Sequence, residues 1–291
     1  RAKLALHEGV PAEQILCGNG AADLIFRLVW AKKPRRALVT APTFAEYATA
    51  LESVGCTVER FFLREQEDFA VTDAFGAAIR PGVDMVFLCQ PNNPTGQLTA
   101  LPLVEQILHR CAACGTLLVV DECFLDFLPD HALHTAKGLL GEGNLVILKA
   151  FTKLYGMAGV RLGYALSADT ALLEQMQACG QPWGVSSLAQ AAGLAALEET
   201  AYVEKVRALI AEQRPRLTAG LRALGLRVLD GKANYLLFQA PETLGEALRQ
   251  RGAVLRSCAN YPGLGPGWYR TAVRTGPENE QLLKLLAEVL E

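Results

Sequence analysis

The sequence of 291 residues lacks a long hydrophobic run and lacks an excess of either charge. No apolar stretch approaches the roughly 20 residues that a membrane-spanning helix needs, and the first residues show no signal-peptide pattern. The 28 basic and 30 acidic residues give a net charge of -2, which leaves no electrostatic footprint for nucleic acid or an anionic membrane. We therefore expect a small-molecule partner, and neither nucleic acid nor a membrane.

Patterns for disulfides and metal sites are absent as well. The eight cysteines are scattered through apolar segments of a long chain, which is typical of reduced thiols in a cytoplasmic protein. Cys111 and Cys114 form one CxxC pair, but no second pair and no histidines at ligand spacing accompany it. We expect this pair to be buried or idle and predict no metal; a metal or redox site is the weaker alternative.

The first 166 residues alternate short apolar runs with helical segments. The apolar runs are residues 37–40, 84–89, 116–122, 145–150 and 161–166. Continuous rather than alternating apolarity predicts strands covered on both faces, as in a mostly parallel α/β sheet. In such sheets ligands bind at the carboxyl ends of the strands. The opening residues 1–16 are typical of the middle of an amphipathic helix.

After residue 165 the pattern changes to longer helices, with a charged run over 198–224. Two β-rich segments, 234–238 and 268–274, and two helical segments, 242–251 and 278–290, complete the chain. We predict an α/β protein with a three-layer α/β/α large domain over 1–167, the remainder of that domain and interdomain helices over 168–198, and a smaller α+β domain over 199–291.

A glycine-rich turn, CGNGAADLIFRL at residues 17–28, opens a predicted helix. Gly20, Ala21 and Ala22 leave the first backbone N–H groups of this helix open to an anion, and the helix dipole favours a phosphate at that place. A glycine-rich turn with an ordinary N-cap is an equal alternative. The glycine spacing matches neither a Walker nor a GxGxxG motif.

Aromatic and amide side chains follow the next predicted strands. Phe44 and Tyr47 come after strand 37–40 and offer rings on which a planar ligand could stack, unless they pack in the core. In CQPNNPTGQ, at 89–97, prolines fix the backbone and free Asn92 and Asn93 to point outward. This is the most specific short motif of the chain.

Ionisable residues lie at the ends of the predicted strands 116–122 and 145–150. Asp121 ends a very apolar strand, where a carboxylate is either paired with a cation or caps a loop. Glu122 and Asp126 are interpreted as surface or structural groups. Lys153 lies on a loop after a buried strand and Arg161 opens the next one. A lysine near other cations in a dry cleft becomes a nucleophile, although most lysines are simply solvated. Together with a phosphate cradle, this inventory fits pyridoxal 5'-phosphate.

The order of these motifs closely resembles the fold type I, class I and II aminotransferases. GNGAAD, PTFAEY, PNNPTG, VVDE, FTK and GVRLGY follow one another as in that family, and the match runs from about residue 11 to the C-terminus. Within it, the sequence is most similar to the branch that contains histidinol-phosphate aminotransferase and L-threonine-O-3-phosphate decarboxylase. The resemblance implies the fold type I architecture, pyridoxal 5'-phosphate as cofactor and a homodimer.

The resemblance also implies a role for each motif residue. Lys153 would form an imine with the cofactor, and Asp121 would pair with the pyridine nitrogen. The other positions implied to bind the cofactor are Gly20, Ala21, Ala22, Phe44, Asn93, Phe124, Thr152 and Arg161. Those implied to bind a phosphorylated amino acid are Asn93, Arg270 at its carboxylate and Arg256 at its phosphate.

The tail of the sequence favours one branch member. LRSCANYPGLGPGWYRTAVRT, at 255–275, resembles the decarboxylase, and so does Phe124, where many relatives have tyrosine. The expected reaction is decarboxylation of L-threonine O-3-phosphate, a step toward the cobalamin side chain. Transamination of histidinol phosphate or a related compound is the alternative. A third hypothesis is an inactive or regulatory cofactor-binding member, against which Lys153 and Asp121 argue.

Two features depart from the family pattern. Many relatives have serine where Ala150 stands and tyrosine where Phe124 stands, so this chain loses two neutral hydrogen bonds to the cofactor, each worth about 1 kcal/mol. Family members also carry an N-terminal arm that covers the active site and reaches the partner subunit. The sequence shows no counterpart to that arm. We expect substrate binding and closure to be impaired if this is the whole polypeptide, and the arm to be mobile if this is the ordered part of a longer one.

Overall fold

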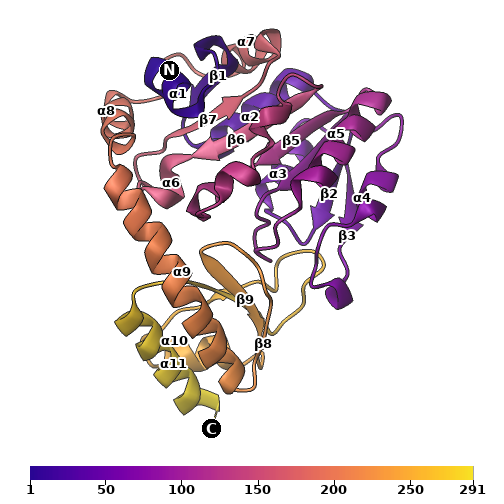
Figure 1. The fold of residues 1–291 in the computed structure, drawn as a ribbon. Coiled ribbons are helices and arrows are strands. Elements are labelled where there is room, and N and C mark those ends of the chain that lie inside the picture. Colours follow the sequence, from indigo (N-terminus) through magenta and orange to yellow (C-terminus); the bar gives the residue numbers. More distant parts are fainter. Residues whose placement is uncertain (291) are drawn as a thin grey trace.

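A seven-stranded mixed sheet makes up the larger part of the computed structural model, which describes residues 1–290 (Figure 1). Its strands lie in the order β1-β7-β6-β5-β4-β2-β3. They are β1 (Ile15–Gly18), β2 (Arg36–Ala41), β3 (Thr57–Phe62), β4 (Met85–Cys89), β5 (Leu117–Asp121), β6 (Leu145–Ala150) and β7 (Gly163–Leu166). β7 runs antiparallel to both neighbours and the other pairs are parallel, which confirms the predicted mostly parallel sheet.

Helices cover both faces of this sheet. One face carries α2 (Ala21–Lys32), α3 (Glu46–Glu52) and α7 (Thr170–Ala178). The other carries α1 (Ala2–Glu8), α4 (Asp73–Ala78), α5 (Leu101–Cys114) and α8 (Ser187–Ala196). In β4, Met85 and Phe87 pack with the first group of helices, whereas Val86 and Leu88 pack with the second. Both sides of each central strand are therefore buried, and the three-layer prediction is confirmed.

A four-stranded antiparallel sheet follows in the C-terminal part of the chain. Its order is β10-β11-β9-β8, with β8 (Arg227–Val228), β9 (Tyr235–Gln239), β10 (Arg256–Ser257) and β11 (Trp268–Ala272). It packs with α9 (Thr200–Ala223), α10 (Leu244–Arg249) and α11 (Gly276–Leu290). The long helix α9 leads from α8 to this sheet (Figure 1). The proposed domain boundaries after residues 167 and 198 stay predictions.

The start of the chain differs from the sequence-based expectation. α1 ends at Glu8 instead of continuing to residue 16, because Gly9 takes a left-handed conformation with φ of 67° and Pro11 cannot extend a helix. Ile15 and Leu16 belong to β1, which the sequence did not predict. β3 was missed as well, because its residues TVERFF, at the sheet edge, form no continuous apolar run. Within residues 1–290, no helix combines the length and the apolarity that crossing a membrane requires.

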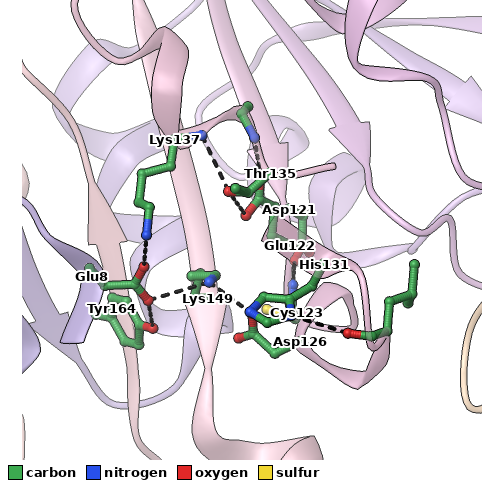
Figure 2. A network of polar contacts seen from close by, with 12 residues as sticks. Glu8, Asp121, Glu122, Cys123, Asp126, His131, Thr135, Lys137, Lys149 and Tyr164 are labelled. Atoms are coloured by element: carbon green, nitrogen blue, oxygen red, sulfur yellow. Dashed lines mark hydrogen bonds and ion pairs between the residues drawn. The ribbon is translucent and has the colours of Figure 1, made fainter. Parts of the chain in front are cut away.

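A buried network of charges joins α1 to the sheet (Figure 2). The Glu8 carboxylate accepts hydrogen bonds from Lys137 Nζ at 3.1 Å, from Lys149 Nζ at 3.3 Å and from the Tyr164 hydroxyl. Lys149 Nζ also donates to Asp126 Oδ1 at 2.9 Å. The side chains of Glu8 and Lys149 are only 2% and 6% exposed. Since the two lysines face two carboxylates, the charge is balanced within the fold.

These donors keep Glu8 ionised. Burial alone raises the pKa of Glu8, but Lys149, the Tyr164 hydroxyl and Lys137 together outweigh it and lower the pKa from 4.5 to about 2. A carboxyl with a lowered pKa in the folded state stabilises the fold at pH values above its unfolded pKa, and this contribution is lost as the pH falls toward the folded pKa. Glu8 therefore makes the fold sensitive to acid.

We expect Glu8 to contribute about 2 kcal/mol of acid sensitivity between about pH 5 and about pH 3. The measurement is the free energy of urea unfolding at both pH values for the wild type and for Glu8→Gln. The variant should lose less stability on acidification, because it has no carboxyl to protonate. Glu288→Gln, at an exposed position of α11, should retain the wild-type pH dependence. Equal pH dependence in wild type and Glu8→Gln would contradict this role.

Candidate active site

A cavity of about 300 Å³ lies at the carboxyl ends of β4, β5 and β6, where Cys89, Asp121 and Ala150 end their strands. Of the predicted site residues, it is lined by Ala21, Ala22, Phe44, Asn93, Asp121, Phe124, Thr152, Lys153, Arg161, Arg256 and Arg270. Gly20, the remaining one, is the N-cap of α2 directly before Ala21. A wider cleft of about 690 Å³ shares Phe124, Lys153, Arg256 and Arg270 and continues along the smaller sheet. The structure therefore brings the predicted residues together, while their roles stay predictions.

Lys153 and Lys149 have opposite surroundings although four residues separate them. Lys153 lies in the short helix α6 (Phe151–Leu154), with Nζ 5.5 Å from the centroid of the Phe124 ring. Partial burial lowers the pKa of Lys153, and the positive charges of Arg270 and Arg161 lower it further. Burial also disfavours the charge of Lys149, but Asp126 and Glu8 outweigh it and raise the pKa of that lysine. Lys153 is thus the lysine primed to act as a neutral amine.

Asp121 is held by two donors from different parts of the chain. Its Oδ2 accepts a hydrogen bond from the Tyr47 hydroxyl at 2.5 Å, and its Oδ1 accepts one from the backbone N–H of Cys123 at 3.0 Å. The residue is 6% exposed and still lines the cavity. A buried carboxylate with both oxygens engaged has a fixed plane, so its free lone pairs have a fixed direction.

Of the two alternatives for Tyr47, packing in the core is confirmed and stacking on a ligand is wrong. Tyr47 is fully buried beneath the cavity and stacks on Phe87, with ring centroids 4.7 Å apart and an interplanar angle of 12°. The reason is its place in the first turn of α3, which turns the ring toward the sheet. Phe44, which lies before that helix, is the aromatic residue that lines the cavity.

The two adjacent asparagines point in different directions, which corrects the expectation that both point outward. Asn92 is buried, donates to Pro42 O at 3.0 Å and accepts from Thr43 Oγ1 at 2.8 Å, so it holds the loop together. Asn93 lines the cavity, and its Oδ1 accepts a hydrogen bond from Arg270. Arg270 also lies over the Tyr235 ring, 4.9 Å from its centroid. Only Asn93 remains available to a ligand.

The start of α2 forms a cradle for an anion. The first backbone N–H groups of any α-helix have no intrahelical partner, and here Ala21 and Ala22, the first two residues of α2, line the cavity. Gly20 has φ of 84°, and a Cβ atom there would lie 2.6 Å from Nη2 of Arg161. The absence of a Cβ atom at residue 20 thus leaves room for the guanidinium in the position that it takes, and the positive φ favours glycine. Arg161 itself lies before β7 with φ of 61° and does not open that strand as expected.

Besides Ala150, which the family resemblance already implied to lie near the cofactor, three further residues line the cavity without having been predicted as site residues: Cys89, Cys123 and Tyr261. A usable signal existed for each, since Cys89 ends a strand, Cys123 follows Asp121 by two residues and Tyr261 lies in the motif-like tail. By contrast, Glu122 is a structural group, and the alternative of a surface position is wrong. It is fully buried and accepts hydrogen bonds from Thr135 and from the Ala136 N–H. Burial raises its pKa to about 7 despite these donors.

Known proteins similar to this chain share one family. The model of that family, "Aminotransferase class I and II", matches residues 2–289. The chain belongs to the class I and II aminotransferase family. A threonine-phosphate decarboxylase of Salmonella typhimurium is 40% identical over 99% of this chain and 80% of the relative. A histidinol-phosphate aminotransferase of Symbiobacterium thermophilum is 36% identical over the whole of this chain and 80% of the relative.

Solved structures agree with this family assignment. The crystal structure of the histidinol-phosphate aminotransferase from Clostridium acetobutylicum superposes with a TM-score of 0.93 at 25% identity, over 99% of this chain and 87% of that one. A decarboxylase from Sulfurospirillum multivorans superposes with a TM-score of 0.91 at 26% identity, over 100% of this chain and 85% of that one. Members of the aminotransferase family depend on pyridoxal 5'-phosphate, and this protein is an enzyme of that kind.

The residues at the cavity fit that cofactor. The cradle of α2 N–H groups and Arg161, which a Cβ at residue 20 would obstruct, offers donors to a phosphate. The fixed carboxylate of Asp121 offers an acceptor to a ring N–H, and Lys153 offers an amine. Ala150 and Phe124 both line the cavity and offer no hydrogen bond, as the sequence indicated.

We expect Lys153 to be the most reactive lysine of the cofactor-free protein. Its lowered pKa leaves more free amine at about pH 8 than an ordinary lysine has, whereas Lys149 is protonated and buried. Trace acetylation followed by peptide mass spectrometry measures the relative rates. Lys153 should react faster than the exposed Lys284, and Lys149 slowest. Added cofactor should protect Lys153 from acetylation. After borohydride reduction, the peptide that contains Lys153 should carry the added mass of the cofactor. Labelling of Lys149 ahead of Lys153 would contradict the assignment.

Proposed function

We propose that this protein is a decarboxylase of L-threonine O-3-phosphate, with Lys153 and Asp121 as its catalytic residues. The observation that carries the proposal is a pair of arginines. β10 and β11 place Arg256 directly opposite Arg270, and both residues line the cavity of Lys153. Two neighbouring cations suit a substrate with two anionic ends.

Substrate chemistry separates the two main candidates. L-threonine O-3-phosphate carries a carboxylate and a phosphate, whereas histidinol phosphate carries a phosphate and no carboxylate. In the proposal Arg270 takes the carboxylate, because its guanidinium already lies beside Asn93 within the cavity. Arg256, on the more exposed strand β10, takes the phosphate. The similarity to the Salmonella typhimurium decarboxylase over 99% of this chain supports this choice.

The cofactor and the chain divide the work. When bound, pyridoxal 5'-phosphate supplies a carbonyl carbon that captures the substrate amine and a ring that accepts the electron pair left on the α-carbon. Lys153 supplies the amine that retains the cofactor until substrate arrives. Asp121 would accept a hydrogen bond from the ring N–H, and Phe44 would pack against the ring. Asn93 would donate a hydrogen bond to the ring hydroxyl.

The arginines decide which bond breaks. If Arg256 holds the phosphate and Arg270 holds the carboxylate of the substrate, these two contacts would set the orientation of the carboxylate at the reacting carbon and would favour the loss of carbon dioxide. Lys153 Nζ would then donate the proton that replaces the carboxylate on that carbon. If the two arginines hold the substrate so that its α-hydrogen is exposed to Lys153 instead, the same lysine would remove that proton, as transamination requires.

The decisive experiment compares the two reactions directly. Purified protein loaded with cofactor should release carbon dioxide from L-threonine O-3-phosphate without any added 2-oxo acid, since decarboxylation needs no amino acceptor. The measurement is carbon dioxide release together with product analysis by mass spectrometry. A strict requirement for 2-oxoglutarate, or turnover of histidinol phosphate alone, would establish the aminotransferase alternative.

Substitution of the arginines extends this comparison. Arg256→Gln should raise KM for the phosphorylated substrate on the order of tenfold or more, since a hydrogen bond to a charged group is worth about 1.5–3 kcal/mol. Its matched control is Arg251→Gln, which lines the wider cleft outside the Lys153 cavity and should leave KM unchanged. An unchanged KM for Arg256→Gln would contradict the proposal that Arg256 binds the substrate phosphate.

We also propose that two copies of the chain associate in the cytoplasm. Leu6 of α1 and Leu188 of α8 are 86% and 82% exposed, and Trp183 before α8 is 95% exposed. α1 and α8 are neighbours, since Lys3 Nζ donates to Leu194 O at 2.9 Å. Large apolar side chains gathered on one side are typical of a covered surface. The eight cysteines form no disulfide, which suits a reducing compartment.

Association can be measured by sedimentation velocity. The wild type should sediment as a dimer at micromolar concentration, and the double variant Trp183→Asp, Leu188→Asp should sediment as a monomer because charges replace the apolar contact. Val254→Asp, at an exposed apolar position of the C-terminal part, should remain dimeric. A monomeric wild type would refute the pairing.

A further inference from the structure

One buried hydroxyl group lies directly beneath the cavity. Tyr47 is fully buried, and its hydroxyl donates to Asp121 Oδ2 at 2.5 Å. The two residues are 74 positions apart and belong to α3 and β5. Apart from this hydroxyl, the surroundings of Tyr47 include the apolar residues Leu51 and Val119. A hydroxyl in such a place destabilises the fold unless it has a hydrogen-bond partner, and Asp121 is that partner.

The ring of Tyr47 is fixed from two sides. It stacks on Phe87 of β4 at 4.7 Å, and it meets the edge of Phe44 at 5.5 Å with an interplanar angle of 82°. Phe44 in turn lines the cavity. One side chain therefore contacts both the residue proposed to cover the cofactor ring and the residue proposed to pair with its nitrogen. Packing against Phe87 requires an aromatic ring but not a hydroxyl.

The direction of the hydrogen bond is fixed as well. Burial and the charge of Asp121 raise the pKa of Tyr47 well above its usual value, so the phenol keeps its proton and can only donate to the carboxylate. The Cys123 N–H donates to the other oxygen of Asp121 at 3.0 Å. Each oxygen thus has one donor from a different segment, and the plane of the carboxylate cannot rotate without breaking one of the two bonds.

We propose that Tyr47 is a positioning residue that sets the orientation of the Asp121 carboxylate toward the ring nitrogen of the cofactor. This inference rests on the proposed role of Asp121 and is independent of the reaction that follows. Tyr47 itself does not line the cavity, so it acts through Asp121. Without the Tyr47 hydroxyl, the Asp121 carboxylate retains one hydrogen-bond donor and can rotate about the bond that joins it to the side chain.

The test measures cofactor binding without substrate. Cofactor-free protein is titrated with pyridoxal 5'-phosphate, and the dissociation constant and the visible absorbance spectrum are recorded. Tyr47→Phe keeps the ring and should weaken binding on the order of tenfold, as expected for loss of one hydrogen bond to a charged group. Its absorbance spectrum should also change with pH differently from that of the wild type. In an Asp121→Asn background, Tyr47→Phe should add no further loss, because the two residues act as one unit.

Tyr164→Phe is the matched control. Tyr164 is also a buried tyrosine that donates to a buried carboxylate, but its partner is Glu8, outside the cavity. This variant should unfold at lower temperature and bind the cofactor as the wild type does. Equal weakening by Tyr47→Phe in both Asp121 backgrounds, or no weakening at all, would overturn the positioning role. If Asp121→Asn itself leaves binding unchanged, both the assignment of Asp121 and this inference fail, whereas loss of decarboxylation alone affects only the proposed function.

Discussion

The register of three parallel strands is the constraint on which the site depends. Cys89 of β4 lies opposite Asp121 of β5, and Asp121 lies opposite Leu148 of β6. The three strands therefore end at one edge, and the segments that follow, including the short helix α6, carry Asn93, Phe124 and Lys153 into one cavity. A slip of β5 by one residue would turn Asp121 to the opposite face of the sheet and place its carboxylate in an apolar layer. The burial of both faces makes such a slip costly, so the fold that protects the core also fixes the chemistry.

The two lysines at the end of β6 have different electrostatic surroundings. Lys149 is part of a buried network with Glu8 and Asp126, in which breaking one pair leaves an uncompensated charge. Lys153 lies four residues on, beyond the reach of these carboxylates and near Arg161 and Arg270. The network anchors the end of β6 and leaves the following helix with a lysine whose neutral form is favoured. On this short segment, Lys149 thus stabilises the fold, whereas Lys153 is the lysine that is free to react.

Local patterns predicted the central strands and the polar residues at their ends, whereas Arg256, Arg270 and Phe124 were implied only by the family resemblance. Continuous apolarity marks β4, β5 and β6, and polar residues at their ends mark the site. What could not be predicted depends on distant contacts. Glu8 meets Lys149 across 141 residues, and Tyr47 meets Asp121 across 74. The residue Asn92 has the same local pattern as Asn93, and only its contact with Thr43 shows that it faces inward. The edge strand β3 was missed because it lacks the pattern of a buried strand.

The division of labour between the two sheets explains how one scaffold can serve two reactions. Asp121 ends a strand of the large sheet and Lys153 and the α2 cradle lie in helices beside it, whereas Arg256 and Arg270 belong to strands of the small sheet. The two parts meet where Arg270 contacts Asn93 and where the Lys232 N–H donates to Gly96 O at 2.6 Å. A small shift of β10 and β11 against that loop would change the angle of a bound carboxylate without moving Lys153 or Asp121. In the proposed mechanism that angle selects the bond that breaks, so the choice between decarboxylation and transamination depends on the contact between the sheets.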